Sequence, residues 1–224
     1  MRFDFPKQDS ADLQEILRFD EVDFSWEPNK KIIDNCSFSI PHTGLWMIVG
    51  KNGSGKSTLT KLIKGVLEPQ GGRITCQSRI SMVFQNPDHQ LLFPSCGSEI
   101  LLNLNCTKDF EITKINQMIE NILKRVGMNG FKNRPIHTLS GGQKQRLAIA
   151  ALIASRSNLL LFDEPTALLD KVSQFEILRL VQDLTNDKHN PLTALWITHR
   201  LDELIYATAI AKMKNGKLSN WKFT

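Results

Sequence analysis

Residues 45–65, "LWMIVGKNGSGKSTLTKLIKG", decide the fold. The first five are continuously apolar, which predicts a strand buried on both faces of a parallel sheet. A glycine-rich loop follows, and "STLTKLIKG" predicts a helix that ends at Gly65. The loop matches GxxxxGK[ST], a pattern whose backbone N–H groups wrap phosphate groups. The stretch therefore predicts a nucleoside triphosphate site between a buried strand and a helix.

This loop divides its contacts between backbone and side chains. We expect Lys56 to reach the β- and γ-phosphate oxygens and the Ser57 hydroxyl to ligand Mg²⁺. The alternative is a chance match in a glycine-rich loop, and the strand before and helix after argue against it. The residues expected to contact ATP here are Gly50, Lys51, Asn52, Gly53, Ser54, Gly55, Lys56, Ser57 and Thr58.

Polar residues also end three further apolar runs. Asp163 and Glu164 close "LLLFDE"; we expect Asp163 to hold Mg²⁺ and Glu164 to position or deprotonate the attacking water. Gln85 follows "ISMVF" and His199 follows "LWIT", so both are expected at the ligand-binding edge of the sheet. We expect Gln85 to serve both Mg²⁺ and catalysis, and His199 to sense the γ-phosphate. Taken alone, a solvated strand end and a structural histidine are the simpler readings.

A second anion cradle stands about ninety positions later, in "LSGGQKQRLAIAALIA". Two glycines after a serine expose backbone N–H groups at the start of a long helix, whose dipole favours phosphate. The residues expected to contact ATP here are Ser140, Gly141, Gly142 and Gln143. A plain helix N-terminus is the alternative.

The remaining patterns surround this core. Residues 17–26 and "CSFSI" alternate as antiparallel strands do, and Asn215-Gly216 signals a hairpin. Residues 95–126 become helical in period, with one apolar face formed by Ile112, Ile115, Ile119, Ile122, Leu123 and Val126. The predicted fold is α/β: a P-loop NTPase (RecA-like) core with an N-terminal antiparallel β lobe and an inserted α-helical lobe at about 95–150. Residues 1–16 form an extension and 17–224 a single domain.

Composition excludes several functions. The chain has 224 residues and a net charge of +5, but no basic run interleaved with aromatics, so nucleic-acid binding is not expected. The four cysteines form no CxxC pair and are expected to be reduced, buried thiols in a cytosolic protein. No run reaches the ~18 apolar residues that would span a bilayer. Any membrane role is therefore expected to come through another chain.

The order of these motifs resembles that of ABC-type ATPases, over residues 17 to about 213. The resemblance implies head-to-tail dimers in which each "LSGGQ" closes over the ATP held by the other chain. It also implies that Trp26 stacks on adenine and that Asp170 touches the partner. Leu168 stands where relatives often have glycine, a departure in that loop.

"QNPDHQLLFPS" is similar to a segment of energy-coupling-factor and cobalt/nickel-type importer ATPases. This resemblance implies a second ATPase subunit, identical or paralogous, and an integral membrane coupling protein that docks between Gln85 and Ser95. The cargo would be a metal ion or vitamin, and the chain would sit peripherally on the inner face of the cell membrane. Many such ATPases carry a C-terminal extension; its absence here predicts dimerisation that depends on ATP and the membrane partner. The alternatives are a soluble assembly factor, for example in iron–sulfur cluster biogenesis, and a catalytically dead scaffold.

Overall fold

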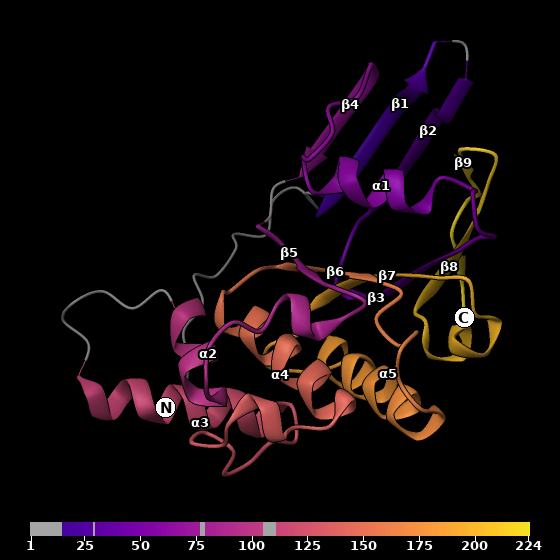
Figure 1. Ribbon diagram of the computed structural model, residues 1–224. Helices are drawn as coiled ribbons and strands as arrows, with labels where there is room; N and C mark the ends of the chain where they lie inside the picture. Colours follow the sequence, from indigo (N-terminus) through magenta and orange to yellow (C-terminus); the bar gives the residue numbers. More distant parts are fainter. Residues whose placement is uncertain (1–14, 29, 77–78, 105–110) are drawn as a thin grey trace.

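A mostly parallel sheet, in which β9 and β10 pair with β8 in antiparallel orientation, forms the centre of the protein (Figure 1). The computed structural model describes residues 15–28, 30–76, 79–104 and 111–224. The strand order is β10-β8-β3-β7-β6-β5, with β9 paired to β8. The strands are β3 (Gly44–Val49), β5 (Ile80–Val83), β6 (Leu159–Asp163), β7 (Thr193–Thr198), β8 (Ala209–Lys214), β9 (Lys217–Leu218) and β10 (Lys222–Phe223). All pairs from β8 to β5 are parallel, so their carboxyl ends meet at one edge.

Side chains of the central strands alternate between two hydrophobic clusters, as the period of two in a strand requires. In β3, Leu45 and Met47 face one cluster, whereas Trp46 and Ile48 face the other. The first cluster is completed by α4 (Gly141–Ala154) and α5 (Lys171–Thr185). The second is completed by α1 (Lys56–Ile63) and the outer β sheet. The two helices α4 and α5 therefore cover the face of the sheet opposite α1 (Figure 1).

The N-terminal β sheet has the order β2-β1-β4, and all its pairs are antiparallel. Its strands are β1 (Leu17–Glu27), β2 (Lys30–Ile40) and β4 (Gly71–Cys76). The two strands expected from the sequence are present, and β4 is an addition that the sequence reading did not include. The Asn215-Gly216 hairpin is also confirmed: both residues have positive φ, at 50° and 74°, and they join β8 to β9.

Helices occupy most of the region expected to form the inserted lobe. They are α2 (Cys96–Asn103), α3 (Ile112–Arg125) and α4, with the 3₁₀ turn η2 (Ile136–Thr138). Two further 3₁₀ turns lie outside this region: η1 (Pro87–His89) before it and η3 (Leu201–Tyr206) near the end of the chain. The predicted apolar face of α3 buries Ile119, Leu123 and Val126. Ile112 is also on the predicted face, but it is the first residue of α3 and stays 77% exposed.

The cysteines follow the prediction in part. Cys36 and Cys96 are buried, Cys76 is half-buried, and the described cysteines form no disulfide. Burial raises the pKa of the Cys36 thiol to about 11 and also raises that of Cys96. Cys106 and nearly all of the predicted extension, residues 1–14, lie outside the described residues. Within the described ranges, none of the helices has the length and apolar character needed to cross a membrane.

Candidate functional site

The glycine-rich loop leaves β3 and enters α1, as the sequence predicts. Gly55 caps α1 at φ +105°, a left-handed conformation that glycine adopts without strain. A Cβ there would lie 2.9 Å from the carbonyl oxygen of Ile32, so the position also has no room for a side chain. The loop therefore depends on glycine both for its turn and for its packing.

Lys56 points back into this loop. Its side chain is 6% exposed, and Nζ donates to the carbonyl oxygens of Gly50 at 2.8 Å and Lys51 at 3.1 Å. Nearby, the Ser54 hydroxyl is buried with no hydrogen-bond partner. A buried ammonium and an unpaired hydroxyl in one loop suit the oxygens of a phosphate chain. The residues present therefore fit the predicted ligand.

Glu164 follows β6 in a conformation that is costly for a side-chain-bearing residue. Its φ is +47°, and its N–H donates to the Ile197 carbonyl oxygen at 2.9 Å. Such left-handed non-glycine residues concentrate at functional sites, where the surrounding structure holds them in place. The hydrogen bond ties the loop after β6 to the end of β7, which carries His199 two residues later.

Three predicted site residues from separate parts of the chain meet: Glu164 after β6, His199 after β7 and Lys56 at the start of α1. Glu164 Oε1 lies 2.9 Å from His199 Nδ1 and 4.0 Å from Lys56 Nζ. Val83 of β5 pairs with Phe162, the residue before Asp163. Gln85 follows Val83 by two residues, so the chain leaves the sheet near Asp163 at this point, and the Gln85 side chain is exposed. The sheet edge thus brings together residues that are more than thirty positions apart in the chain.

Asp163 has the environment of a cation ligand. Burial, and secondly the Glu164 carboxylate, raise its pKa, while Lys56 and a hydrogen bond from Thr60 partly oppose the rise. A buried carboxylate whose charge is poorly compensated favours a bound cation. The Ser57 hydroxyl and the Gln85 amide offer further hard oxygen donors at the same edge, so the donor set fits Mg²⁺.

The raised pKa of Asp163 predicts a stability effect. The pKa of Asp163 in the folded protein lies above its pKa in the unfolded chain. The folded protein therefore becomes less stable as pH rises through the interval between the two pKa values, and the charged carboxylate remains destabilising at neutral pH. Asp163→Asn removes the charge, so the melting temperature of nucleotide-free protein should rise at pH 7.5. The gain should vanish at a pH below both pKa values. Thermal unfolding with and without MgATP checks this, and a lower melting temperature at pH 7.5 would contradict it.

Trp26, for which stacking on adenine is a prediction, lies beside α1. It is at the end of β1, 55% exposed, and its Nε1 donates to Thr58 Oγ1 at 3.3 Å. Lys61 Nζ lies 5.3 Å from the ring centroid, and Phe24 packs edge-on at 5.2 Å. The ring is thus fixed beside α1 while much of it remains open to solvent.

This placement predicts a nucleotide-affinity effect. Trp26→Ala should raise KM for ATP about tenfold with little change in kcat, because stacking on a base contributes roughly 1–3 kcal/mol. Trp26→Phe keeps a ring and should stay within about threefold of wild type. Steady-state ATPase kinetics of the two variants distinguish stacking from packing. Equal KM values for Ala and wild type would exclude a base contact.

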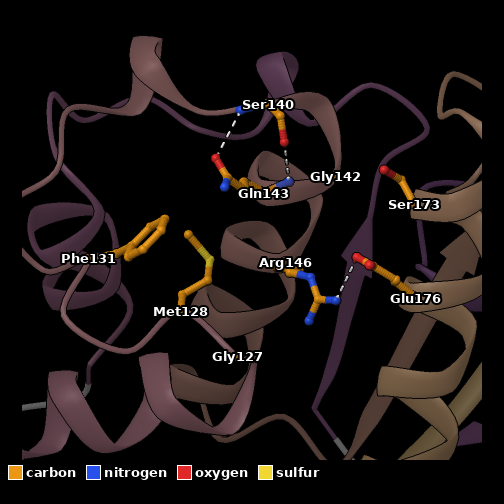
Figure 2. A pocket seen from close by; sticks show the side chains of 9 residues that line it. All are labelled: Gly127, Met128, Phe131, Ser140, Gly142, Gln143, Arg146, Ser173 and Glu176. Atoms are coloured by element: carbon orange, nitrogen blue, oxygen red, sulfur yellow. Dashed lines mark hydrogen bonds and ion pairs between the residues drawn. The ribbon is translucent and has the colours of Figure 1, made fainter.

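The second cradle, residues 140–143, opens α4. Ser140 accepts from the Gln143 N–H at 3.3 Å, and Gln143 Oε1 accepts from the Ser140 N–H at 3.1 Å, a capping box (Figure 2). The open space beside it is about 460 Å³ and is lined by Gly127, Met128, Phe131, Ser140, Gly142, Gln143, Arg146, Ser173 and Glu176. Because α4 and α1 pack on opposite faces of the sheet, the two cradles begin helices on different sides of it.

The comparisons with known proteins agree with this arrangement of motifs. The sequence profile of the ABC transporter family matches residues 33–167. "ABC transporter I family member 10" of Arabidopsis thaliana is 44% identical over 187 residues, which are 84% of this chain and 69% of that protein. The chain belongs to the ABC transporter family.

Two further relatives place it within the family. An energy-coupling factor transporter ATP-binding protein, EcfA1 of Streptococcus mutans, is 35% identical over 92% of this chain and 78% of its own length. The structure of cbiO1 from Clostridium perfringens, described as part of the ABC transporter complex cbiONQ, has a TM-score of 0.84 and 30% identity. It covers 93% of this chain and 88% of that one. The chain is thus an ABC ATPase that binds ATP, homologous to energy-coupling-factor ATPases.

In this ABC ATPase, the segment from Gln85 to Ser95, here termed the docking segment, is held in place by a side chain of α2. The buried Glu99 carboxylate accepts from the N–H groups of Leu92 at 2.9 Å and Phe93 at 3.0 Å. Leu92 itself is 77% exposed and Phe93 38% exposed. A fixed backbone therefore presents apolar side chains to solvent, which is typical of an interaction surface.

The docking segment is also tied to the helix of the second cradle. Lys144 Nζ donates to Asp88 Oδ1 at 2.6 Å. The fully buried Gln145 donates from Nε2, at 3.3 Å, to the carbonyl oxygen of Phe84, the residue directly before this segment, while its Oε1 has no partner. Sequence reasoning missed both contacts, because nothing local to "QKQR" indicates which loop packs against it.

Asp170 caps α5. It accepts from the Ser173 N–H at 3.0 Å and from the Ser173 hydroxyl at 2.6 Å. These contacts hold the pKa of Asp170 below its usual range. Leu168, the departure from the pattern of relatives, is 62% exposed and lies in the loop between Glu164 and α5. Asp170 therefore has a structural role within this chain, and contact with a partner remains a prediction.

Proposed function

We propose that the chain is the ATP-hydrolysing subunit of an energy-coupling-factor-type importer of a metal ion or vitamin. Two such subunits, identical or paralogous, would pair head to tail. The observation that carries the proposal is the separation of the two cradles. Residues 50–58 lead into α1 and residues 140–143 begin α4, and these two helices pack on opposite faces of one sheet. Within the described residues, the second phosphate cradle begins a helix on the face of the sheet opposite α1, which favours pairing with the ATP site of a second chain.

The proposed chemistry is phosphoryl transfer from ATP to water. Lys56 and the backbone N–H groups of the first cradle hold the phosphates. Glu164 Oε1 accepts a proton from the attacking water, and the 2.9 Å contact with His199 Nδ1 fixes the carboxylate in place. His199 Nε2 is then the ring nitrogen that contacts the γ-phosphate. Ser140 and the adjoining N–H groups of the partner chain stabilise the charge that develops on the phosphoryl oxygens.

Mg²⁺ would be held by Ser57, Asp163 and Gln85. When bound, it neutralises charge on the β- and γ-phosphate oxygens. The support is the donor chemistry of these three residues and the poorly compensated charge of buried Asp163. Glu164, the next residue after Asp163, is not proposed as a Mg²⁺ ligand, because it accepts the proton of the attacking water.

The docking segment is the proposed receptor for an integral membrane coupling protein. It presents Leu92 and Phe93, and Leu102 of the neighbouring α2 is 57% exposed. The ties from Lys144 and Gln145 would pass a displacement of this segment to α4 and so to the second cradle. Through this partner the protein would sit on the cytoplasmic face of the cell membrane. The similarity to energy-coupling factor transporter ATP-binding proteins supports a role in transport. The cargo would be chosen by the membrane subunits.

A crosslinked pull-down in the native cells tests this proposal. Tagged Glu164→Gln protein is trapped with MgATP, crosslinked and read by mass spectrometry. An integral membrane protein should be recovered, together with a second ATPase subunit. Leu92→Asp, which charges the docking segment without touching the ATP site, should lose the membrane protein and keep the second ATPase. Recovery of soluble proteins alone would overturn the importer and favour an assembly factor.

A further inference from the structure

Glu203 is a buried carboxylate that the proposed chemistry does not use. It lies in η3, four residues after His199, and is 2% exposed. Its Oε2 accepts from Trp196 Nε1 at 2.9 Å, and its Oε1 accepts from Thr166 Oγ1 at 2.5 Å. Arg200 Nε lies 3.6 Å from Oε1. The Glu203 side chain therefore connects Thr166, in the loop after β6, with Trp196 and Arg200, which lie on either side of His199.

Each partner of Glu203 belongs to a segment that carries the ATP chemistry. Thr166 follows Glu164 by two residues, and Trp196 precedes His199 by three on β7. Thr166 is 1% exposed and Trp196 is fully buried, so neither donor can turn to water instead. Two buried donors that depend on one carboxylate make that carboxylate costly to remove.

Trp196 extends the connection to the metal side of the site. Its ring stacks on Phe162, the residue before Asp163, with centroids 5.1 Å apart. Arg200, on the other side of His199, donates from its N–H to Thr198 Oγ1 at 3.0 Å and from Nη2 to Asp202 Oδ2 at 2.9 Å. The segments before and after His199 are thus both anchored. Glu203 adds a side-chain connection from them to the loop of Glu164, beside the backbone hydrogen bond from the Glu164 N–H to the Ile197 carbonyl oxygen.

We propose that Glu203 is a positioning residue that sets the spacing between Glu164 and His199. It contacts no substrate; it holds the two loops so that the Glu164–His199 contact keeps its 2.9 Å length when ATP binds. A displacement of about 1 Å in such a pair can cost about a hundredfold in rate. The inference rests on the proposed roles of Glu164 and His199.

Two substitutions at one position test the proposal. Glu203→Met keeps the length of the side chain and removes both acceptors. Glu203→Gln keeps an oxygen for Trp196 and can donate to the Thr166 hydroxyl, so both loops stay tied. We expect Glu203→Met to lower kcat at least tenfold, with KM for ATP within about threefold, and Glu203→Gln to recover most of the loss. Asp183→Asn, a change at an exposed acidic residue of α5, should stay within about twofold of wild type.

A second background separates positioning from general damage. In His199→Ala protein, Glu203→Met should change kcat by less than about twofold, because the pair it positions is already broken. A full additional loss in that background, or a loss shared equally by kcat and nucleotide binding, would overturn the proposal. Equal activity of Glu203→Met and wild type would do so as well.

Thr166→Val and Trp196→Phe test the same proposal from the two donors to Glu203 if Glu203→Met does not fold. Each removes one donor; Thr166→Val keeps the shape of the side chain, and Trp196→Phe keeps an aromatic ring beside Phe162. Each should lower kcat in the wild-type background but not with His199→Ala. Additive losses would reject positioning by Glu203. If His199→Ala and Glu164→Gln themselves leave kcat unchanged, the proposed catalytic roles fail instead, whatever the behaviour of Glu203.

Discussion

Glu164→Gln should lower kcat for ATP hydrolysis by about 10²–10³-fold, because a positioned general base contributes that much to proton transfer. Gln keeps the length of the side chain and can still accept from His199 Nδ1, whose present distance to Oε1 is 2.9 Å. It cannot take a proton from water. KM for ATP, or the affinity for a fluorescent ATP analogue, should therefore stay within about threefold of wild type.

Glu21 supplies a matched control for this substitution. It is also a glutamate with positive φ, at 48°, but it is exposed on β1 and away from the loop of Lys56. Glu21→Gln makes the same chemical change in the same backbone conformation, and it should leave kcat within about twofold of wild type. If Glu164→Gln turned over as fast as the Glu21 variant, the proton acceptor would have to be another group.

Lys56→Ala should weaken ATP binding about a hundredfold, since hydrogen bonds to a charged group contribute roughly 1.5–3 kcal/mol each and Lys56 is placed to make more than one. Its ammonium already lies in the centre of the loop, bonded to the carbonyl oxygens of Gly50 and Lys51. ATP offers phosphate oxygens in the same place. Equilibrium binding of a fluorescent ATP analogue measures the loss, and turnover at sub-saturating ATP should fall with it.

Lys64→Ala is the control for this change. Lys64 is the C-cap residue of α1, eight positions after Lys56 on the same element, and its side chain is exposed. It removes the same charge from the protein, so it corrects for long-range attraction between a basic chain and ATP. Comparable losses from both variants would mean that net charge rather than the loop sets the affinity.

The positions of Glu164 and His199 at the sheet edge could be predicted from the sequence, because each depends only on the few residues of its own strand. An apolar strand that ends in a polar residue places that residue at the sheet edge, and β3, β6 and β7 are parallel and adjacent. Glu164, His199 and Lys56 therefore meet as expected. The helix α5 went unnoticed although Ile177, Val181 and Leu184 repeat at helical spacing and are buried.

Other features could not be read from local patterns. The strand β4 is short and begins with two glycines, so its pairing with β1 is decided by the tertiary fold. Glu203 looks like an ordinary polar residue of a turn, and only the fold shows that Thr166 and Trp196 converge on it. The contact of Gln145 with Phe84 is likewise set by packing between elements sixty residues apart.

The mass of Glu164→Gln protein in solution, measured by light scattering with and without MgATP, tests the central claim most directly. If the second cradle closes over ATP held by another chain, saturating MgATP should shift the protein from 25.4 kDa to twice that mass. Adding Gly141→Asp, where a Cβ would lie in ordinary contact at 3.4 Å from Leu169, places negative charge against the phosphate and should keep it monomeric with ATP still bound. A Glu164→Gln protein that stays monomeric in saturating MgATP, or a Gly141→Asp variant that dimerises equally well, would contradict the account.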